Sequence, residues 1–170
     1  FTFGMAAAAA GLSAGEAVMI SATNLTSAGQ FAGLTLIQTQ ASLFEMALTT
    51  LVINLRYALM SLSLAQKLDP AMSRLQKAVL AFGNTDEIFA VAVSHPVVRF
   101  HYMLGLILTP MAGWVGGTFL GCAFSALLPE AVRAAFAVAI YGMFIAIVAP
   151  VARQLKSVAI VVGIAVAMSV

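Results

Sequence analysis

Three stretches of this chain, residues 17–44, 100–129 and 134–152, contain no Asp, Glu, Lys or Arg. Each is long enough to supply the roughly 20 residues with which an α-helix crosses the hydrocarbon core of a bilayer. Only 8% of the 170 residues are charged and 62% are hydrophobic, whereas roughly a quarter of the residues of a soluble domain are charged. The chain is therefore predicted to be an integral membrane protein embedded in a lipid bilayer.

Polar residues divide the chain into about seven apolar segments, which are expected to be helices because hydrocarbon offers no partner to a free backbone N–H or C=O. The predicted fold is an all-α membrane protein, a polytopic helical bundle of about six to seven transmembrane segments, some of them broken or re-entrant. Residues 1–170 are expected to form a single transmembrane domain whose N-terminal helix is truncated. The segments are 1–10, 15–39, 43–66, 73–93, 99–124, 130–149 and 155–170.

The few charged residues of the loops bear on orientation. Lys67, Arg74 and Lys77 form the most basic loop, and the positive-inside rule places such a loop in the cytoplasm. Strict alternation would then put Arg153 and Lys156 outside, which the same rule disfavours, so at least one segment is expected to be broken or re-entrant. A net charge of +2 from scattered loop residues does not predict a nucleic-acid-binding surface.

Small residues repeat at helical spacing in two places. Gly105 lies on one helix face with Gly113, Gly117 and Gly121, and such a stripe lets two transmembrane helices approach closely. Ala159, Gly163 and Ala167 repeat the pattern in the last segment. That second face would suit another subunit, so a homo-oligomer is one alternative.

Residues with catalytic or metal-binding chemistry are sparse. Cys122 has no second cysteine to pair with, which leaves neither a disulfide framework nor a cysteine-based zinc site. His95 and His101 flank Pro96 in a loop and are expected to be solvated rather than metal ligands. We expect no enzyme, no catalytic residue, no metal and no cofactor.

Arg56 is the residue that most needs an explanation. It lies 13 residues after Leu43 and 10 before Gln66, near mid-membrane in a continuous helix that rises about 1.5 Å per residue. An Arg at that depth costs roughly 2.5 to 3.5 kcal/mol, so it must face a partner, a cavity or a kink. Asn54 precedes it by two residues, and together they form a first polar notch.

Two further polar notches interrupt apolar segments, and each contains or adjoins a glycine. Polar notches beside Gly or Asn near mid-span are typical of broken helices that form a solute site at the membrane midplane. Gly83 would make the opening of one such helix less costly. The candidate substrate-binding residues of the three notches are Asn24, Ser27, Gly29, Gln30, Asn54, Arg56, Asn84, Thr85, Asp86 and Glu87.

Charge complementarity suggests roles for these groups. Arg56 and the segment Ser27–Gln30 would bind a carboxylate, since half-helix N-termini attract negative charge. Asp86 or Glu87 would bind an ammonium group or carry a coupled proton. The alternative is that Arg56 is a buried ion-pair partner of Asp86 or Glu87 and holds helices together without touching a substrate. Glu16 and Glu45 are expected to be helix-terminus residues.

Five stretches in order along the chain resemble the AzlC family, the large subunit of branched-chain amino acid exporters. They are FTFG with AGLS near the start, SAGQFAGL at 27–34, INLRYALMSLSLA at 53–65, TDE at 85–87 and GWVGGTFLG at 113–121. The family commonly has His where this chain has Tyr57, so no histidine role is carried over. A small-Ser pair stands in the family where this chain has Ala28 and Gly29.

The resemblance implies export of branched-chain amino acids such as valine or leucine across the bacterial inner membrane by a multi-pass protein. It also implies a small second membrane subunit of the AzlD kind as partner. Two rival functions remain, a non-transporting structural subunit of a membrane complex and a small-solute channel. A channel would conduct without saturating, whereas a carrier would saturate and show counterflow.

Overall fold

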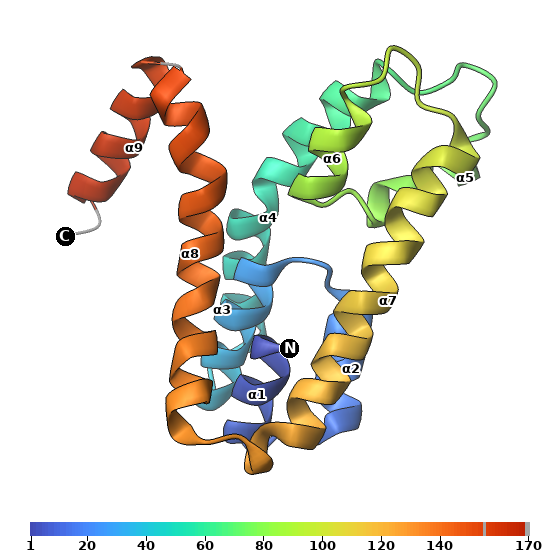
Figure 1. The fold of residues 1–170 in the computed structure, drawn as a ribbon. Helices are drawn as coiled ribbons and strands as arrows, with labels where there is room; N and C mark the ends of the chain where they lie inside the picture. Colours follow the sequence, from blue (N-terminus) through green and yellow to red (C-terminus); the bar gives the residue numbers. More distant parts are fainter. Residues whose placement is uncertain (155, 169–170) are drawn as a thin grey trace. The chain divides into compact units, whose positions relative to one another are not determined.

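The computed structural model describes residues 1–154 and 156–168, and these residues form nine α-helices and one 3₁₀ turn (Figure 1). Residues 155, 169 and 170, at the ends of the last predicted segment, lie outside the described residues. Because all of these elements are helical, the predicted all-α class is confirmed for the described residues. The elements are α1 (Thr2–Ala9), α2 (Ala14–Thr23), α3 (Ser27–Gln38), α4 (Leu43–Ala65), α5 (Arg74–Phe82), α6 (Asp86–Ala92), α7 (Phe100–Phe124), η1 (Ser125–Leu127), α8 (Glu130–Gln154) and α9 (Lys156–Met168).

Each of the seven predicted apolar segments contains helix, and two of them are broken. Segment 15–39 is divided into α2 and α3, and segment 73–93 is divided into α5 and α6. Both breaks fall at predicted polar notches. The third notch is not a break, because α4 runs without interruption from Leu43 to Ala65. The stretch VINLRYALM contains no proline or glycine that would end the helix.

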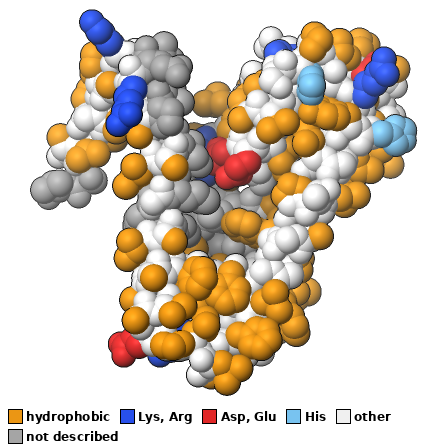
Figure 2. Space-filling model, in the orientation of Figure 1, with side chains coloured by type: hydrophobic (Ala, Val, Ile, Leu, Met, Phe, Trp, Pro, Cys, Tyr) orange, Lys and Arg blue, Asp and Glu red, His pale blue; other side chains and the backbone are white. Residues whose placement is uncertain are grey.

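Two helices of the described residues are long and apolar enough to cross a membrane. They are α4, with 23 residues, and the 28 residues Phe100–Leu127, and their most apolar 18-residue windows have mean hydropathies of 1.4 and 1.5. Only 6% and 17% of their most apolar windows are buried, unlike the mostly buried core helix of a soluble protein. Figure 2 shows how widely hydrophobic side chains cover the visible surface and how few charged ones interrupt them.

The described helices fall into two compact units, one reaching from the N-terminal helix to Ala126 and the other beginning at Leu127. In the second unit α8 packs against α9. Ala159, Gly163 and Ala167 are all exposed on α9, and a Cβ added at Gly163 would meet no atom within 4 Å. The second subunit predicted for this face stays a prediction.

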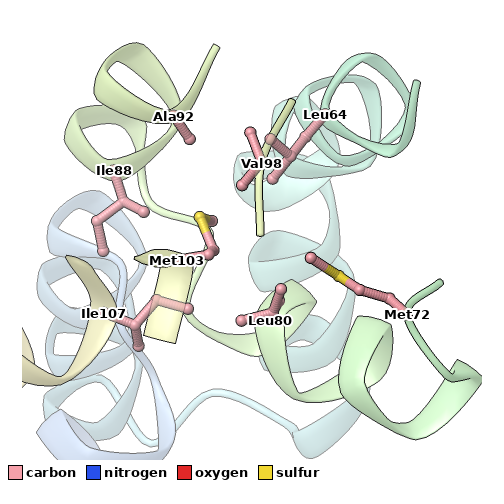
Figure 3. Close-up of a cluster of buried hydrophobic side chains, with 8 residues drawn as sticks. All are labelled: Leu64, Met72, Leu80, Ile88, Ala92, Val98, Met103 and Ile107. Atoms are coloured by element: carbon pink, nitrogen blue, oxygen red, sulfur yellow. The ribbon is translucent and has the colours of Figure 1, made fainter. Parts of the chain in front are cut away.

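A hydrophobic core holds α4, α5, α6 and α7 of the first unit together (Figure 3). Its centre includes Leu80, Val98 and Met103, which are at most 1% exposed. Burying side chains of this size stabilises the fold by roughly 1.5 to 3 kcal/mol each. The core consists of Leu64, Met72, Leu80, Ile88, Ala92, Val98, Met103 and Ile107.

The loops before α5 and after α6 are joined next to this core. Leu68 and Val98 form an isolated parallel bridge, in which the Val98 N–H donates to the Lys67 carbonyl over 2.8 Å and the Asp69 N–H donates to the Val98 carbonyl over 3.0 Å. The Lys67 ammonium donates to the carbonyl of Val93. The end of α4 is thereby fixed beside the start of α7.

Helix α1 packs on α7 at backbone distance. A Cβ added at Gly4 would lie 2.1 Å from the Thr118 carbonyl oxygen, and one added at Gly121 would lie 2.1 Å from the Phe1 carbonyl oxygen. The predicted close approach of helices is thus confirmed at Gly121. It does not extend along the whole stripe, because a Cβ at Gly113 would meet nothing within 4 Å.

Hydroxyl side chains fix the starts of several helices. Ser13 and Glu16 form a capping box at α2, and the Ser42 hydroxyl accepts from the Glu45 N–H at α4. The prediction that Glu16 and Glu45 lie at helix starts is confirmed. The Ser13 N–H and hydroxyl both donate to the Glu16 carboxylate.

Candidate functional site

Arg56 and Asp86 form an ion pair near the middle of α4. An Arg56 Nη lies 2.9 Å from an Asp86 carboxylate oxygen, and the two side chains are 41% and 34% exposed. Arg56 is the fourteenth of the 23 residues of α4, and Asp86 is the first residue of α6. Of the two carboxylates predicted as partners, Asp86 is the one that pairs with Arg56.

The rest of the Arg56 guanidinium is only partly satisfied. Its Nη2 donates to the Tyr57 hydroxyl over 3.3 Å, and its central carbon lies 5.0 Å from the centre of the Tyr57 ring. The Arg56 Nε is buried without a hydrogen-bond partner in the described structure. A buried, unpaired N–H costs free energy unless an acceptor reaches it.

The α5–α6 break places Asn84 and Thr85 beside α4. Asn84 is 3% exposed, and its Nδ2 donates to the Ser61 hydroxyl over 3.3 Å, whereas its Oδ1 is buried without a partner among the described residues. Thr85 precedes the first turn of α6 and makes no side-chain cap. The break therefore holds one amide side chain half satisfied against α4.

Gly83 is needed in this break for a reason other than the predicted one. Its φ is −96°, a value that any residue adopts, so the backbone freedom of glycine is not used. A Cβ at Gly83 would instead lie 2.4 Å from Cγ2 of Ile107. The absence of a side chain lets the break lie directly on α7.

The α2–α3 break spans residues 24–26, between Thr23 and Ser27. This break lies within the predicted polar notch, at its N-terminal side, and Ser27–Gln30, predicted to bind a carboxylate, follow it. Thr26 caps α3 through a 3.4 Å bond that its hydroxyl accepts from the Gly29 N–H, so Ser27 to Gln30 form the first turn. A Cβ at Gly29 would lie 2.6 Å from Thr26 Cγ2 and 3.5 Å from Asn54 Nδ2. Gly29 thereby leaves room for the capping side chain of Thr26.

Gln30 belongs to a buried hydrogen-bond network that the sequence reasoning missed in part. Its Nε2 donates to the Asn24 carbonyl over 2.6 Å and to the Ser21 hydroxyl over 3.3 Å. The Ser21 hydroxyl lies 2.7 Å from that of Thr118. Ser21, Gln30 and Thr118 are at most 2% exposed. Hydroxyl side chains within apolar segments could have indicated such a network. Nothing in the sequence, however, predicts that α2 packs against α7.

The predicted residues do not converge on one point. Asn54 and Arg56, two residues apart on one helix, point about 200° from each other, so Asn54 adjoins the start of α3 while Arg56 binds α6. Glu87 is exposed and makes no salt bridge among the described residues. The structure thus divides the ten candidates between the two helix breaks, with Asn54 beside the start of α3 and Arg56 paired with the start of α6.

Buried polar atoms without a partner concentrate in these two groups. Within the described residues there are five such side-chain atoms, and four of them belong to predicted site residues. Three are acceptors and one is a donor. They are Gln30 Oε1, Asn54 Oδ1, Asn84 Oδ1 and Arg56 Nε, and the fifth atom is Trp114 Nε1.

Comparison with known proteins gives relatives for most of the chain. Residues 1–128 match the AzlC protein family. An uncharacterized membrane protein of Archaeoglobus fulgidus is 35% identical over 152 residues, which are 88% of this chain and 66% of the relative. The inner membrane protein YgaZ of Escherichia coli is 32% identical over 130 residues, 74% of this chain and 53% of the relative.

An uncharacterized membrane protein of Helicobacter pylori is 31% identical over 124 residues, 71% of this chain and 54% of the relative. The chain thus spans between about half and two thirds of the length of these relatives. No solved structure matches the chain significantly.

Proposed function

The chain belongs to the AzlC family of membrane proteins, and from that premise we propose that it is a carrier that exports branched-chain amino acids of the valine or leucine type. Its relatives are membrane proteins, one of them an inner membrane protein of Escherichia coli. The proposed location is the bacterial inner membrane, and the proposed substrate is recognised by its amino-acid backbone and by an apolar wall that accepts its side chain.

The observation that carries this proposal is the set of buried polar atoms left without partners beside the helix breaks. Three amide oxygens can accept from an ammonium group and one guanidinium N–H can donate to a carboxylate. A zwitterionic amino acid carries both an ammonium group and a carboxylate. Buried polar groups are otherwise almost always satisfied, so their concentration at the predicted residues favours a polar ligand.

In the proposed site Arg56 binds the substrate carboxylate, and Asp86 or Glu87 binds its ammonium group or carries a coupled proton. The first turn of α3, which lies beside Asn54 rather than Arg56, has to approach Arg56 to bind the same carboxylate. Because Arg56 already holds Asp86 at 2.9 Å, the substrate carboxylate has to compete with Asp86 for the guanidinium. Binding therefore releases Asp86 for the ammonium group or for a proton.

The proposal includes a larger architecture. We propose six to seven membrane segments in a single transmembrane domain, of which α2–α3 and α5–α6 are the broken ones, with the Lys67–Lys77 loop in the cytoplasm. A small second membrane subunit of the AzlD kind is the proposed partner. We also propose that the protein is neither an enzyme nor a cofactor-binding protein.

The test is efflux of radiolabelled valine from preloaded proteoliposomes, with and without the small subunit. Saturable efflux is expected from the wild type, and Arg56→Gln and Asp86→Asn are expected to lower it at least about tenfold, since a charge-assisted bond contributes about 1.5 to 3 kcal/mol. The matched control is Arg133→Gln, which removes an exposed arginine outside the candidate site.

The Arg56–Asp86 pair also favours a second candidate function, that of a structural subunit whose polar groups only hold helices together. That function predicts no valine efflux from folded wild-type protein with or without the partner. Efflux that continues unchanged in Arg56→Gln would refute the assigned site, and efflux that does not saturate would indicate a channel.

A further inference from the structure

The hydrogen bonds that link Gln30, Ser21 and Thr118 beside the α2–α3 break run in a defined direction from donor to acceptor. The Thr118 hydroxyl donates its single proton to the Trp114 carbonyl over 3.1 Å, so in its 2.7 Å contact with Ser21 it must accept. Ser21 therefore donates to Thr118 and accepts from Gln30. The chain of donors runs from Gln30 through Ser21 and Thr118 into the backbone of α7.

The same contacts fix the orientation of the Gln30 amide. A backbone carbonyl can only accept a hydrogen bond, so the group 2.6 Å from the Asn24 carbonyl must be the Gln30 NH₂. Both of its N–H donors are then used, one on Asn24 and one on Ser21. The Gln30 Oε1 is left as a buried acceptor without a partner in the described structure.

Asn24 is the first residue after α2, and the carbonyls at a helix end need partners outside the helix. Gln30, in the first turn of α3, supplies that partner across the break. Since Gln30 is 1% exposed and Ser21 and Thr118 are 0% and 2% exposed, water does not compete for these bonds. The end of α2 and the start of α3 are thus held at one distance by side chains anchored in α7.

We infer that Ser21, Gln30 and Thr118 are positioning residues that set the geometry of the α2–α3 break. They act on the solute through the backbone N–H groups at the start of α3 and through the direction of Gln30 Oε1. Ser21 and Thr118 need not touch the solute. Without the network the break has to be ordered again each time a solute binds, which weakens binding more than it slows the later steps.

Thr118→Val tests this inference, because valine keeps the shape of threonine and removes only the hydroxyl. Its counterpart Thr118→Ser keeps the hydroxyl, and Thr35→Val is the matched control, since Thr35 is exposed and bonds only within its own helix. Ser21→Ala is the second variant if Thr118→Val does not fold. Hydrogen exchange of the peptide covering residues 20–31, measured in nanodiscs, is the first readout.

Exchange in this peptide is expected to rise about tenfold in Thr118→Val and Ser21→Ala and to stay within about twofold of wild type in Thr118→Ser and Thr35→Val. The transport readout rests on the proposed function. There, KM for valine is expected to rise about tenfold in Thr118→Val with the maximal rate within about threefold of wild type, and Thr118→Ser is expected to restore KM.

The two proposals fail in different ways. Folded wild-type protein that moves no valine refutes the proposed function, and the exchange measurement still decides the inference. Unchanged exchange in both Thr118→Val and Ser21→Ala overturns the inference whether or not valine is transported. A defect in Thr118→Ser with none in Thr118→Val overturns it as well, because serine keeps the hydroxyl and lacks only the methyl group of threonine.

Discussion

Removing both members of the Arg56–Asp86 pair should destabilise the protein less than the sum of the two single removals. At the observed 2.9 Å, two unit charges attract by about 6 kcal/mol for an effective dielectric constant of about 20. The side chains are 41% and 34% exposed, so screening and desolvation reduce the net contribution to between that of a surface pair, about 0 to 1 kcal/mol, and that of a buried pair, about 3 to 5 kcal/mol.

We therefore expect Arg56→Gln and Asp86→Asn each to lower the free energy of unfolding by about 2 kcal/mol. The double variant should lose about 1 to 3 kcal/mol less than the sum of the two, because it leaves no unpaired charge between the helices. The assay is denaturant unfolding in lipid bicelles, analysed as a double-mutant cycle. Glu87→Gln is the matched control, since it neutralises the adjacent, exposed carboxylate.

Strict additivity of the two single substitutions would refute the reasoning, since it would mean that the ion pair contributes no coupling energy. An equally large effect of Glu87→Gln would refute it too, because the stabilisation would then come from the general negative charge of the α6 start rather than from the Arg56–Asp86 contact.

Two further predictions test the packing and the membrane. Gly83→Ala should lower the free energy of unfolding by about 1 to 3 kcal/mol, because its Cβ would lie 2.4 Å from Ile107; Gly105→Ala, where a Cβ meets nothing within 4 Å, should leave thermal unfolding unchanged or slightly improved. Trp114 is the single tryptophan and lies near the middle of Phe100–Leu127, so lipids with brominated acyl chains should quench the fluorescence. Quenching by aqueous acrylamide alone would contradict a membrane position for α7.

Helix positions were predictable because polar residues end apolar helices in recognisable ways. The segment limits at Leu43 and Phe100 follow from local sequence, as do the breaks at 24–26 and 83–85. The polar notch around Arg56 looked the same in sequence and yet leaves α4 whole. A charged residue in a helix can be satisfied by a break or by a partner from another helix, and only the fold brings Asp86 to Arg56.

Long-range contacts account for what the sequence did not predict. Gln30 was recognised as a site residue from its local surroundings, but its partner Ser21 is fixed by Thr118, which lies 97 residues further along the chain. Gly83 was expected to provide backbone freedom, whereas the structure uses its lack of a side chain against Ile107. Both roles depend on where α7 passes, and no local pattern contains that information.

The pairing of Arg56 with Asp86 has an electrical consequence for the proposed carrier. One positive and one negative charge held 2.9 Å apart add no net charge to the moving part of the protein, and a zwitterionic amino acid adds none either. A transport cycle that moves only these groups carries no current, and the membrane voltage does no work on it. Any current recorded during valine export would therefore be carried by coupled ions alone.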